Sequence, residues 1–132
     1  MAVFVDTSAI LALLVPTDAA HEPAARAFAG LRDEQAPLVT TSYVLVESYA
    51  LMGRRLGLKA VDAFRQDFEL LLDVIWVGRE LHDAGLDVLL SRGKSDISLV
   101  DATSWVVIRE HGIGRVFAFD RHFMSEGFSL VG

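Results

Sequence analysis

Two aspartates follow short apolar segments of the chain, at places where their carboxylates could hold a metal ion. Asp6 comes directly after residues 3–5 (VFV), and Asp120 comes directly after residues 116–119 (VFAF). If both segments are parallel strands, their carboxyl ends meet at one edge of a sheet, where such sheets bind ligands. Two carboxylates there would suit a hard divalent cation. For each aspartate taken alone, a helix cap or a turn residue is the more common explanation.

Glu47 is a third candidate because it falls on an apolar helix face. Its neighbours at helical spacing are Tyr43, Val44, Ala50 and Leu51. A carboxylate on such a face is partly buried, and a buried charge needs a metal ion or a partner of opposite charge. The alternative partners of Glu47 are Arg54 and Arg55, which lie two turns further along the same helix.

Asp101 is the fourth candidate, in the first turn of a helix that begins near Ser98. These two residues match a capping box, which would give Asp101 a purely structural role. The apolar neighbours Ile97 and Trp105 nevertheless indicate that this helix start packs inward. Asp96 lies in the polar loop just before it, where it could support the same site or stay solvated.

The four acids, if they meet, predict a magnesium or manganese site. Carboxylates that close together repel one another by several kcal/mol at low effective dielectric constant, and a divalent cation removes that conflict. The chain has no cysteine, and its four histidines show no paired ligand spacing. Only His122 lies near the proposed site. Oxygen ligands alone favour Mg²⁺ or Mn²⁺ over zinc.

Short apolar strands alternating with helices must position these acids. The expected strands are residues 1–5, 37–41, 74–77, 116–119 and 128–131. The expected helices are residues 7–15, 24–31, 43–56, 61–72, 81–90 and 98–110. This alternation predicts an α/β fold with a short, mainly parallel sheet of four to five strands flanked by helices.

Composition and charge narrow the function classes. With 132 residues, 52% of them hydrophobic and 23% charged, the sequence predicts one compact domain over residues 1–132. The lack of cysteine favours a reducing cytoplasm. The longest apolar run, residues 9–15, is far shorter than the roughly 20 residues that cross a bilayer, so no membrane association is expected. The net charge of −6 argues against a general nucleic-acid coat protein, although ten of the twelve basic residues are arginines, which suit phosphate contact.

Four segments of the chain resemble the acidic motifs of the PIN-domain family. They are residues 3–9 (VFVDTSA), 40–47 (TTSYVLVE), 96–102 (DISLVDA) and 119–123 (FDRHF). Their order and spacing, and the length of the chain, resemble the stand-alone VapC-type ribonuclease toxins of prokaryotic toxin–antitoxin pairs. One departure is His122, because some relatives carry another acid at this place, two residues after the fourth aspartate. The resemblance implies a three-layer PIN-like fold.

The resemblance also implies an activity, namely RNA cleavage with Mg²⁺ or Mn²⁺ held by an acidic quartet. Carried over by motif, the metal-site and catalytic residues would be Asp6, Glu47, Asp101 and Asp120, with Asp96 as an auxiliary ligand. Small hydroxyl donors that could fix carboxylates or phosphate around them are Thr7, Ser8 and Ser98. By position, the arginines expected to contact RNA are Arg121, Arg92 and Arg115, although each could equally be a solvated surface charge.

Protein partners follow from the same resemblance. Toxins of this type are held inactive by a small antitoxin that covers the acidic groove, and an Arg-bearing peptide would suit that groove. A homodimer is expected through the helices of residues 24–31 and 43–56, although the apolar faces of these helices could instead be internal.

Three other functions remain as alternatives. A catalytically silent PIN-fold binding module would keep the acids without cutting RNA. A receiver-like signalling domain would need an aspartate after the third strand and a late lysine, but Gly78 and Arg79 follow that strand and no lysine follows Lys94. A haloacid-dehalogenase-type phosphatase would need a second aspartate two residues after Asp6, where this chain has Ser8.

Overall fold

A parallel five-stranded sheet forms the centre of the computed structural model, which describes residues 1–94 and 96–131. The strands lie in the order β3-β2-β1-β4-β5. Their bounds are β1 Val3–Val5, β2 Leu38–Thr41, β3 Leu72–Ile75, β4 Arg115–Phe117 and β5 Ser129–Val131. The central strand β1 is fully covered, because all three of its residues are at most 1% exposed.

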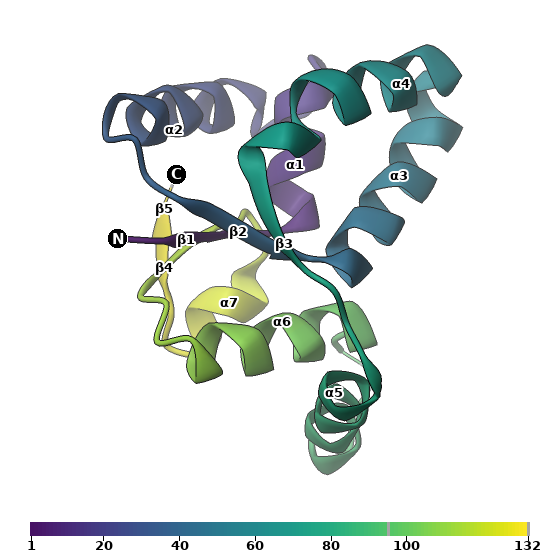
Figure 1. Cartoon of the computed structure of the whole chain (residues 1–132), viewed down its shortest axis with the longest axis vertical. Coiled ribbons are helices and arrows are strands. Elements are labelled where there is room, and N and C mark those ends of the chain that lie inside the picture. Colours follow the sequence, from purple (N-terminus) through teal and green to yellow (C-terminus); the bar gives the residue numbers. More distant parts are fainter. Residues whose placement is uncertain (95, 132) are drawn as a thin grey trace.

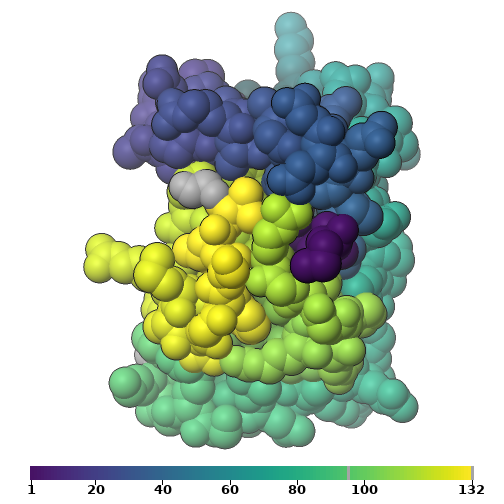
Figure 2. Space-filling model, turned by 90° about the vertical axis from the view of Figure 1, so that its left-hand side faces the viewer, coloured from purple at the N-terminus to yellow at the C-terminus, as the bar shows by residue number. Residues whose placement is uncertain are grey.

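Helices cover both faces of the sheet and make the molecule three-layered (Figure 1). On one side lie α1 Thr7–Leu14, α2 His21–Asp33, α3 Ser42–Leu56 and α4 Leu58–Asp67. On the other side lie α5 Arg79–Ser91, α6 Leu99–Glu110 and α7 Arg121–Ser125. Figure 2 shows the C-terminal segment with β5 (yellow) between α2 (blue) and α5 (green). The α/β fold class and the mainly parallel sheet predicted from the sequence are confirmed.

Four of the described helices begin with a side-chain cap. Asp6 directly follows β1, Thr41 is the last residue of β2, and Asp120 lies three residues after β4, which ends at Phe117 rather than at Phe119 as expected. Asp6 accepts a hydrogen bond from the Ser8 amide at the start of α1, and Thr41 accepts one from Val44 at the start of α3. Asp120 caps α7, and Ser98 caps α6 with the full capping box expected from the sequence. Such caps satisfy backbone donors that a helix start leaves unpaired. Asp6 and Asp120 therefore stay close to the carboxyl edge of the sheet.

Several element boundaries differ from those expected. The helix predicted for residues 61–72 is α4, which ends at Asp67 and is followed by the 3₁₀ turn η1, Glu69–Leu71. Leu72 then begins β3, so the strand predicted at residues 74–77 lies two residues earlier. The short helix α7 was not predicted. The helix predicted for residues 24–31 extends over His21–Asp33, and that for residues 81–90 over Arg79–Ser91.

Gly85 lets α5 and α6 approach closely. A Cβ atom at this position would overlap Thr103 Oγ1 and lie 3.2 Å from the Thr103 Cα, so the backbone of α6 would have to move. We therefore expect Gly85→Ala to lower the free energy of unfolding by about 1–3 kcal/mol, measured by urea denaturation.

Gly30, inside α2, is the matched control for this substitution. A Cβ atom there meets no heavy atom within 4 Å, so Gly30→Ala should raise stability by up to about 1 kcal/mol through helix propensity alone. Equal effects of the two substitutions would contradict the close packing of α5 on α6.

Within the described part of the chain, no helix is long and apolar enough to cross a membrane.

Candidate functional site

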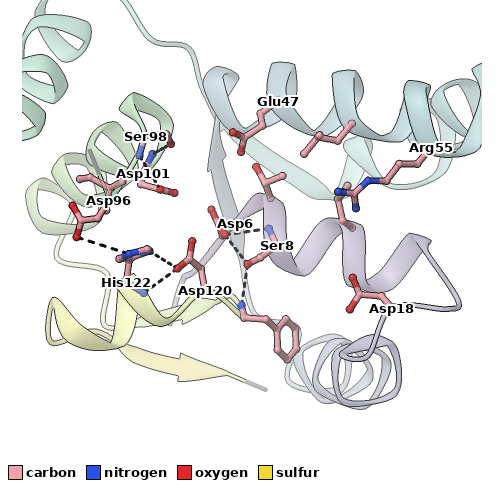
Figure 3. Close-up of a pocket in the computed structure, with 15 residues that line it drawn as sticks. Asp6, Ser8, Asp18, Glu47, Arg55, Asp96, Ser98, Asp101, Asp120 and His122 are labelled. Atoms are coloured by element: carbon pink, nitrogen blue, oxygen red, sulfur yellow. Dashed lines mark hydrogen bonds and ion pairs between the residues drawn. The ribbon is translucent and has the colours of Figure 1, made fainter. Parts of the chain in front are cut away.

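A cavity of about 610 Å³ opens at the carboxyl edge of the sheet (Figure 3). Carboxylates dominate its wall. They belong to Asp6, Asp18, Glu47, Asp96, Asp101 and Asp120. These residues come from five separate stretches of the chain, so the fold brings together all five acids that the sequence analysis singled out and adds Asp18.

Ser8 connects the carboxylate of Asp6 to the segment that follows β4. Its hydroxyl donates to Asp6 Oδ2 at 2.6 Å and its amide donates to the same oxygen at 3.1 Å. The Ser8 Oγ also accepts a hydrogen bond from the Phe119 amide at 2.9 Å. Since Phe119 precedes Asp120, one hydroxyl positions both strand-end aspartates. Asp6 is only 3% exposed, so its orientation is well determined by these bonds.

His122 holds the carboxylate of Asp120. The His122 amide donates to Asp120 Oδ1 at 2.9 Å, and its Nδ1 lies 2.7 Å from the same oxygen. The other ring nitrogen lies 4.0 Å from Asp96 Oδ2. Asp96 itself forms an ion pair with Arg92 at 3.1 Å, which holds the pKa of its carboxyl below the usual range. His122, which lies where some relatives carry a further acid, therefore orients Asp120.

Ser98 orients Asp101 through the capping box. The Ser98 amide donates to Asp101 Oδ2 at 3.2 Å, and the Asp101 amide donates back to Ser98 Oγ at 3.1 Å. Asp101 nevertheless lines the cavity, so the structural and the functional interpretation of this residue hold together. The cap is what points its side chain at the site.

Glu47 is half-buried on α3 and lines the same cavity. The alternative expected from the sequence was an ion pair with Arg54 or Arg55. No such pair exists between these residues in the described chain. The side chain points from α3 toward the aspartates (Figure 3).

The three site aspartates share a feature that fits a cation. Each uses one carboxylate oxygen for its hydrogen bonds, namely Asp6 Oδ2, Asp101 Oδ2 and Asp120 Oδ1. No hydrogen bond from the residues that the structure describes reaches the second oxygen of any of them. These oxygens are hard ligands of the kind that Mg²⁺ and Mn²⁺ bind.

The acids ring the cavity rather than meet at one point. In residues 1–94 and 96–131, no three histidine or acidic side chains are already arranged as ligands of one ion. Mg²⁺ tolerates such an arrangement, because it usually keeps several of its waters and takes only one or two carboxylates from a protein.

The other residues expected at the site are placed unevenly. Thr7 lines the cavity, is 6% exposed, and lies 3.5 Å from Ser48 Oγ through its hydroxyl. Arg121 is exposed beside Asp120 but is not part of the cavity wall.

Two of the arginines expected to contact RNA lie elsewhere or are already bound. Arg115 stands at the amino end of β4, the opposite edge of the sheet, and pairs with Glu34 at 2.8 Å. Arg92 is held by Asp96 and Glu126 and lies over the Trp105 ring. The structure thus brings neither Arg115 nor Arg92 into the cavity.

The sequence analysis missed two charged residues of the cavity wall, Asp18 and Arg55. Arg55 could have been found, because it follows Glu47 by two steps of four along α3, with Leu51 between them, and all three line the cavity. Asp18 lies in the connection between α1 and α2 and carries no such signal.

A model of the PIN domain matches residues 3–125. The chain belongs to the PIN-domain family. Over 98% of its length this PIN domain is 37% identical to the "23S rRNA-specific endonuclease VapC20" of two Mycobacterium tuberculosis strains, covering 97% of that protein. It also resembles the crystal structure of M. tuberculosis VapC20, described as a "Sarcin-Ricin loop cleaving toxin". There the TM-score is 0.82 and the identity 35%, over 96% of each chain. The family resemblance expected from the motifs is confirmed.

The burial of the carboxylates in the PIN-domain site, and the repulsion between them, also favour a bound cation. Burial raises the pKa of the Asp6 carboxyl from 3.8 to about 7, and the charge of Asp101 adds to the rise although hydrogen bonds from Ser8 oppose it. Burial likewise raises the pKa of Asp101, with a further contribution from the charge of Asp120. A bound cation would stabilise all these carboxylates in their ionised form.

Ser8→Ala should destabilise this PIN domain by about 1–3 kcal/mol, because it removes a donor to buried Asp6 and leaves the Phe119 amide without its acceptor. The measurement is the free energy of unfolding in urea. Ser91→Ala is the control, since the Ser91 hydroxyl is exposed and donates only to Val88 O at 2.9 Å, so its effect should stay within about 0.5 kcal/mol. Equal stability of the two variants would contradict the bridging role of Ser8.

Proposed function

We propose that this PIN domain is a divalent-metal-dependent endoribonuclease, the toxin of a type II toxin–antitoxin pair. The observation that carries the proposal is the cavity itself, into which three aspartates from separate segments each present one oxygen without a hydrogen bond. The identity of 37% to relatives named as ribosomal RNA endonucleases supports RNA as the substrate. PIN-domain nucleases as a class depend on divalent metal ions, which fits this donor set.

The residues proposed to hold Mg²⁺ or Mn²⁺ are Asp6, Asp101 and Asp120 together with Glu47. When bound, the cation would supply a more acidic water and neutralise charge that builds on the phosphate oxygens. Glu47 or Asp101 would accept the proton of the water that attacks phosphorus. In-line attack breaks the bond to the 3′-oxygen of the preceding nucleotide, which leaves a 5′-phosphate and a 3′-hydroxyl.

Neighbouring residues would act by positioning these acids. Ser8 fixes Asp6, and Ser98 fixes Asp101, so their loss would misplace oxygens that must meet one ion. Thr7 is buried beside them. Asp96 is proposed as an auxiliary ligand of the cation, although its carboxylate also forms an ion pair with Arg92. Arg121, next to Asp120, is proposed to contact a substrate phosphate.

Ribosomal RNA of the large subunit is the proposed substrate, because the relatives with this length and identity are named for 23S rRNA. An antitoxin is the proposed protein partner, with basic side chains that would complement the acidic cavity. A homodimer is also proposed. On α3, one of the two helices suggested for it, Val46 is 67% exposed and available for such a contact.

The decisive experiment is cleavage of ribosomal RNA and total cellular RNA by the purified protein freed of any antitoxin. Cutting should require Mg²⁺ or Mn²⁺, stop on chelation and leave 5′-phosphate ends. A folded protein that binds the cation but cuts neither RNA would instead be a binding module. A protein that binds no cation would overturn the metal site as well.

A further inference from the structure

The acidic cavity has a second end whose residues the proposed metal chemistry does not use. Figure 3 shows the metal-site acids gathered on one side, while Arg55 and Asp18 lie on the other. The apolar residues of the wall include Leu51, which lies between Glu47 and Arg55 on α3, and Leu11 of α1. An apolar wall beside the guanidinium of Arg55 is suited to a nucleotide, whose sugar and base are largely apolar on their faces and whose phosphate is anionic.

Charge makes this second end important for an RNA substrate. Six carboxylates line the cavity, and among the described residues of its wall Arg55 is the only arginine or lysine. RNA is a polyanion, and its binding depends on cationic side chains that neutralise phosphates. A single divalent cation at the acidic end leaves the remainder of the cavity negative. Arg55 is therefore the permanent positive charge available to a phosphate inside it.

Arg55 is also free to make that contact. In the portion of the chain that the structure describes, no carboxylate lies within 4.0 Å of its guanidinium. Asp18 lies at the same end of the cavity but does not pair with Arg55, and its carboxylate accepts a hydrogen bond from the Ala20 amide at 2.8 Å. The planar guanidinium donates two parallel hydrogen bonds, a geometry that matches a phosphate group.

The helix α3 sets the distance between the two ends. Glu47, Leu51 and Arg55 follow one another at intervals of four residues and all line the cavity. Eight residues of helix correspond to a rise of about 12 Å, and long helical side chains lean toward the amino end of their helix. Figure 3 shows the Arg55 side chain extending from α3 over the cavity. Its guanidinium is thus placed to reach a phosphate near, but not at, the acidic cluster.

We propose that the end of the cavity formed by Arg55, Leu11 and Leu51 is a subsite for the RNA backbone. In it, Arg55 binds a phosphate next to the one that is cleaved, and the leucines contact the nucleotide between them. This inference rests on the proposed function, because it deepens the assignment of RNA as the substrate of the same cavity. Arg55 is a substrate-binding residue in this scheme and takes no part in proton transfer.

Arg54 offers a matched control. Both arginines are exposed in the last turn of α3, where a cation interacts favourably with the helix dipole, but Arg54 does not line the cavity. The variants Arg54→Gln and Arg55→Gln therefore change the net charge by the same amount, and each removes one positive charge from the last turn of α3. Only Arg55→Gln removes a charge from the cavity.

The test measures binding of a short fluorescent single-stranded RNA in the presence of chelator, at several salt concentrations, and metal-dependent cleavage of the same RNA. Arg55→Gln should weaken binding about tenfold and reduce the slope of log affinity against log salt by about 0.7, the value for one lost phosphate contact on a single strand. Arg54→Gln should change the affinity less than twofold. Arg55→Lys should keep the slope while losing part of the affinity, since it keeps the charge without the two-pronged geometry.

The outcomes separate the subsite from the function on which it rests. If the unmodified protein cuts RNA and the two glutamine variants bind it equally, the subsite is refuted and the endoribonuclease stands. If the unmodified protein neither binds nor cuts RNA, both proposals fall. Matching thermal midpoints of the glutamine variants establish that any difference in affinity is local.

Discussion

Asp6→Asn is expected to reduce metal-dependent RNA cleavage by at least about 10²–10³-fold, the scale found when one key electrostatic group is removed from an active site. The substitution keeps an oxygen that can accept the hydrogen bonds from Ser8, so the local structure survives. What it removes is the charge of the buried carboxylate whose other oxygen is proposed to bind the cation. The measurement is the initial rate of cleavage of a defined RNA at saturating Mg²⁺.

The control for this variant is Asp62→Asn. Asp62 is exposed on α4, away from the cavity, and its side chain accepts a hydrogen bond from Gln66 at 3.0 Å. The two variants make the same chemical change, and Asp62→Asn should cut RNA at the rate of the unmodified protein. Cleavage by Asp6→Asn at more than a tenth of that rate would contradict the metal-site assignment. Binding of Mg²⁺, followed by calorimetry, should weaken in parallel.

The parts of the fold that the sequence could predict are those set by neighbouring residues. A short apolar strand followed by a capping side chain is a local signal that located Asp6 correctly, and the three-residue spacing of a capping box located Ser98 and Asp101. The boundary between α4 and β3 was predicted wrongly because Leu72 fits the helical spacing of the apolar residues before it. Its actual place depends on pairing with Leu38 of β2, a contact distant in sequence.

In the candidate site, too, the features set by local sequence could be predicted and those set by contacts distant in sequence could not. The acids that follow strands could be located, because parallel topology alone brings the ends of those strands to one edge. Arg115 was expected near RNA, but it begins a strand and therefore lies at the opposite edge. The sequence could not reveal that Asp18 faces Arg55 across the cavity, because that depends on how the connection between α1 and α2 packs near the end of α3. Nor could it reveal that Ser8, at the start of α1, accepts a hydrogen bond from the Phe119 amide in the segment after β4.

Without metal, the contribution of Asp6 to the stability of the protein should fall as the pH rises from about 4 to about 7. Burial raises the pKa of its carboxyl to about 7 in the folded protein, whereas the unfolded chain ionises near 3.8. Between these values the folded state holds a proton that the unfolded state has released, so raising the pH favours unfolding. The stabilising effect is complete below 3.8 and is lost as the pH passes 7, at a cost of a few kcal/mol.

Asp6→Asn isolates this contribution from that of groups that act oppositely. Arg115 lowers the pKa of Glu34, and Arg92 lowers that of Asp96. These two carboxyls therefore make the protein less stable on acidification, and both remain in the variant. In chelator, Asp6→Asn should therefore unfold at a higher urea concentration than the unmodified protein at pH 8, with the difference shrinking toward pH 5. Mg²⁺ should reverse the order at pH 8, because a cation that binds only the folded protein stabilises the ionised carboxylate. A difference between the two proteins that is independent of pH would show that the Asp6 carboxyl is not held protonated by its burial.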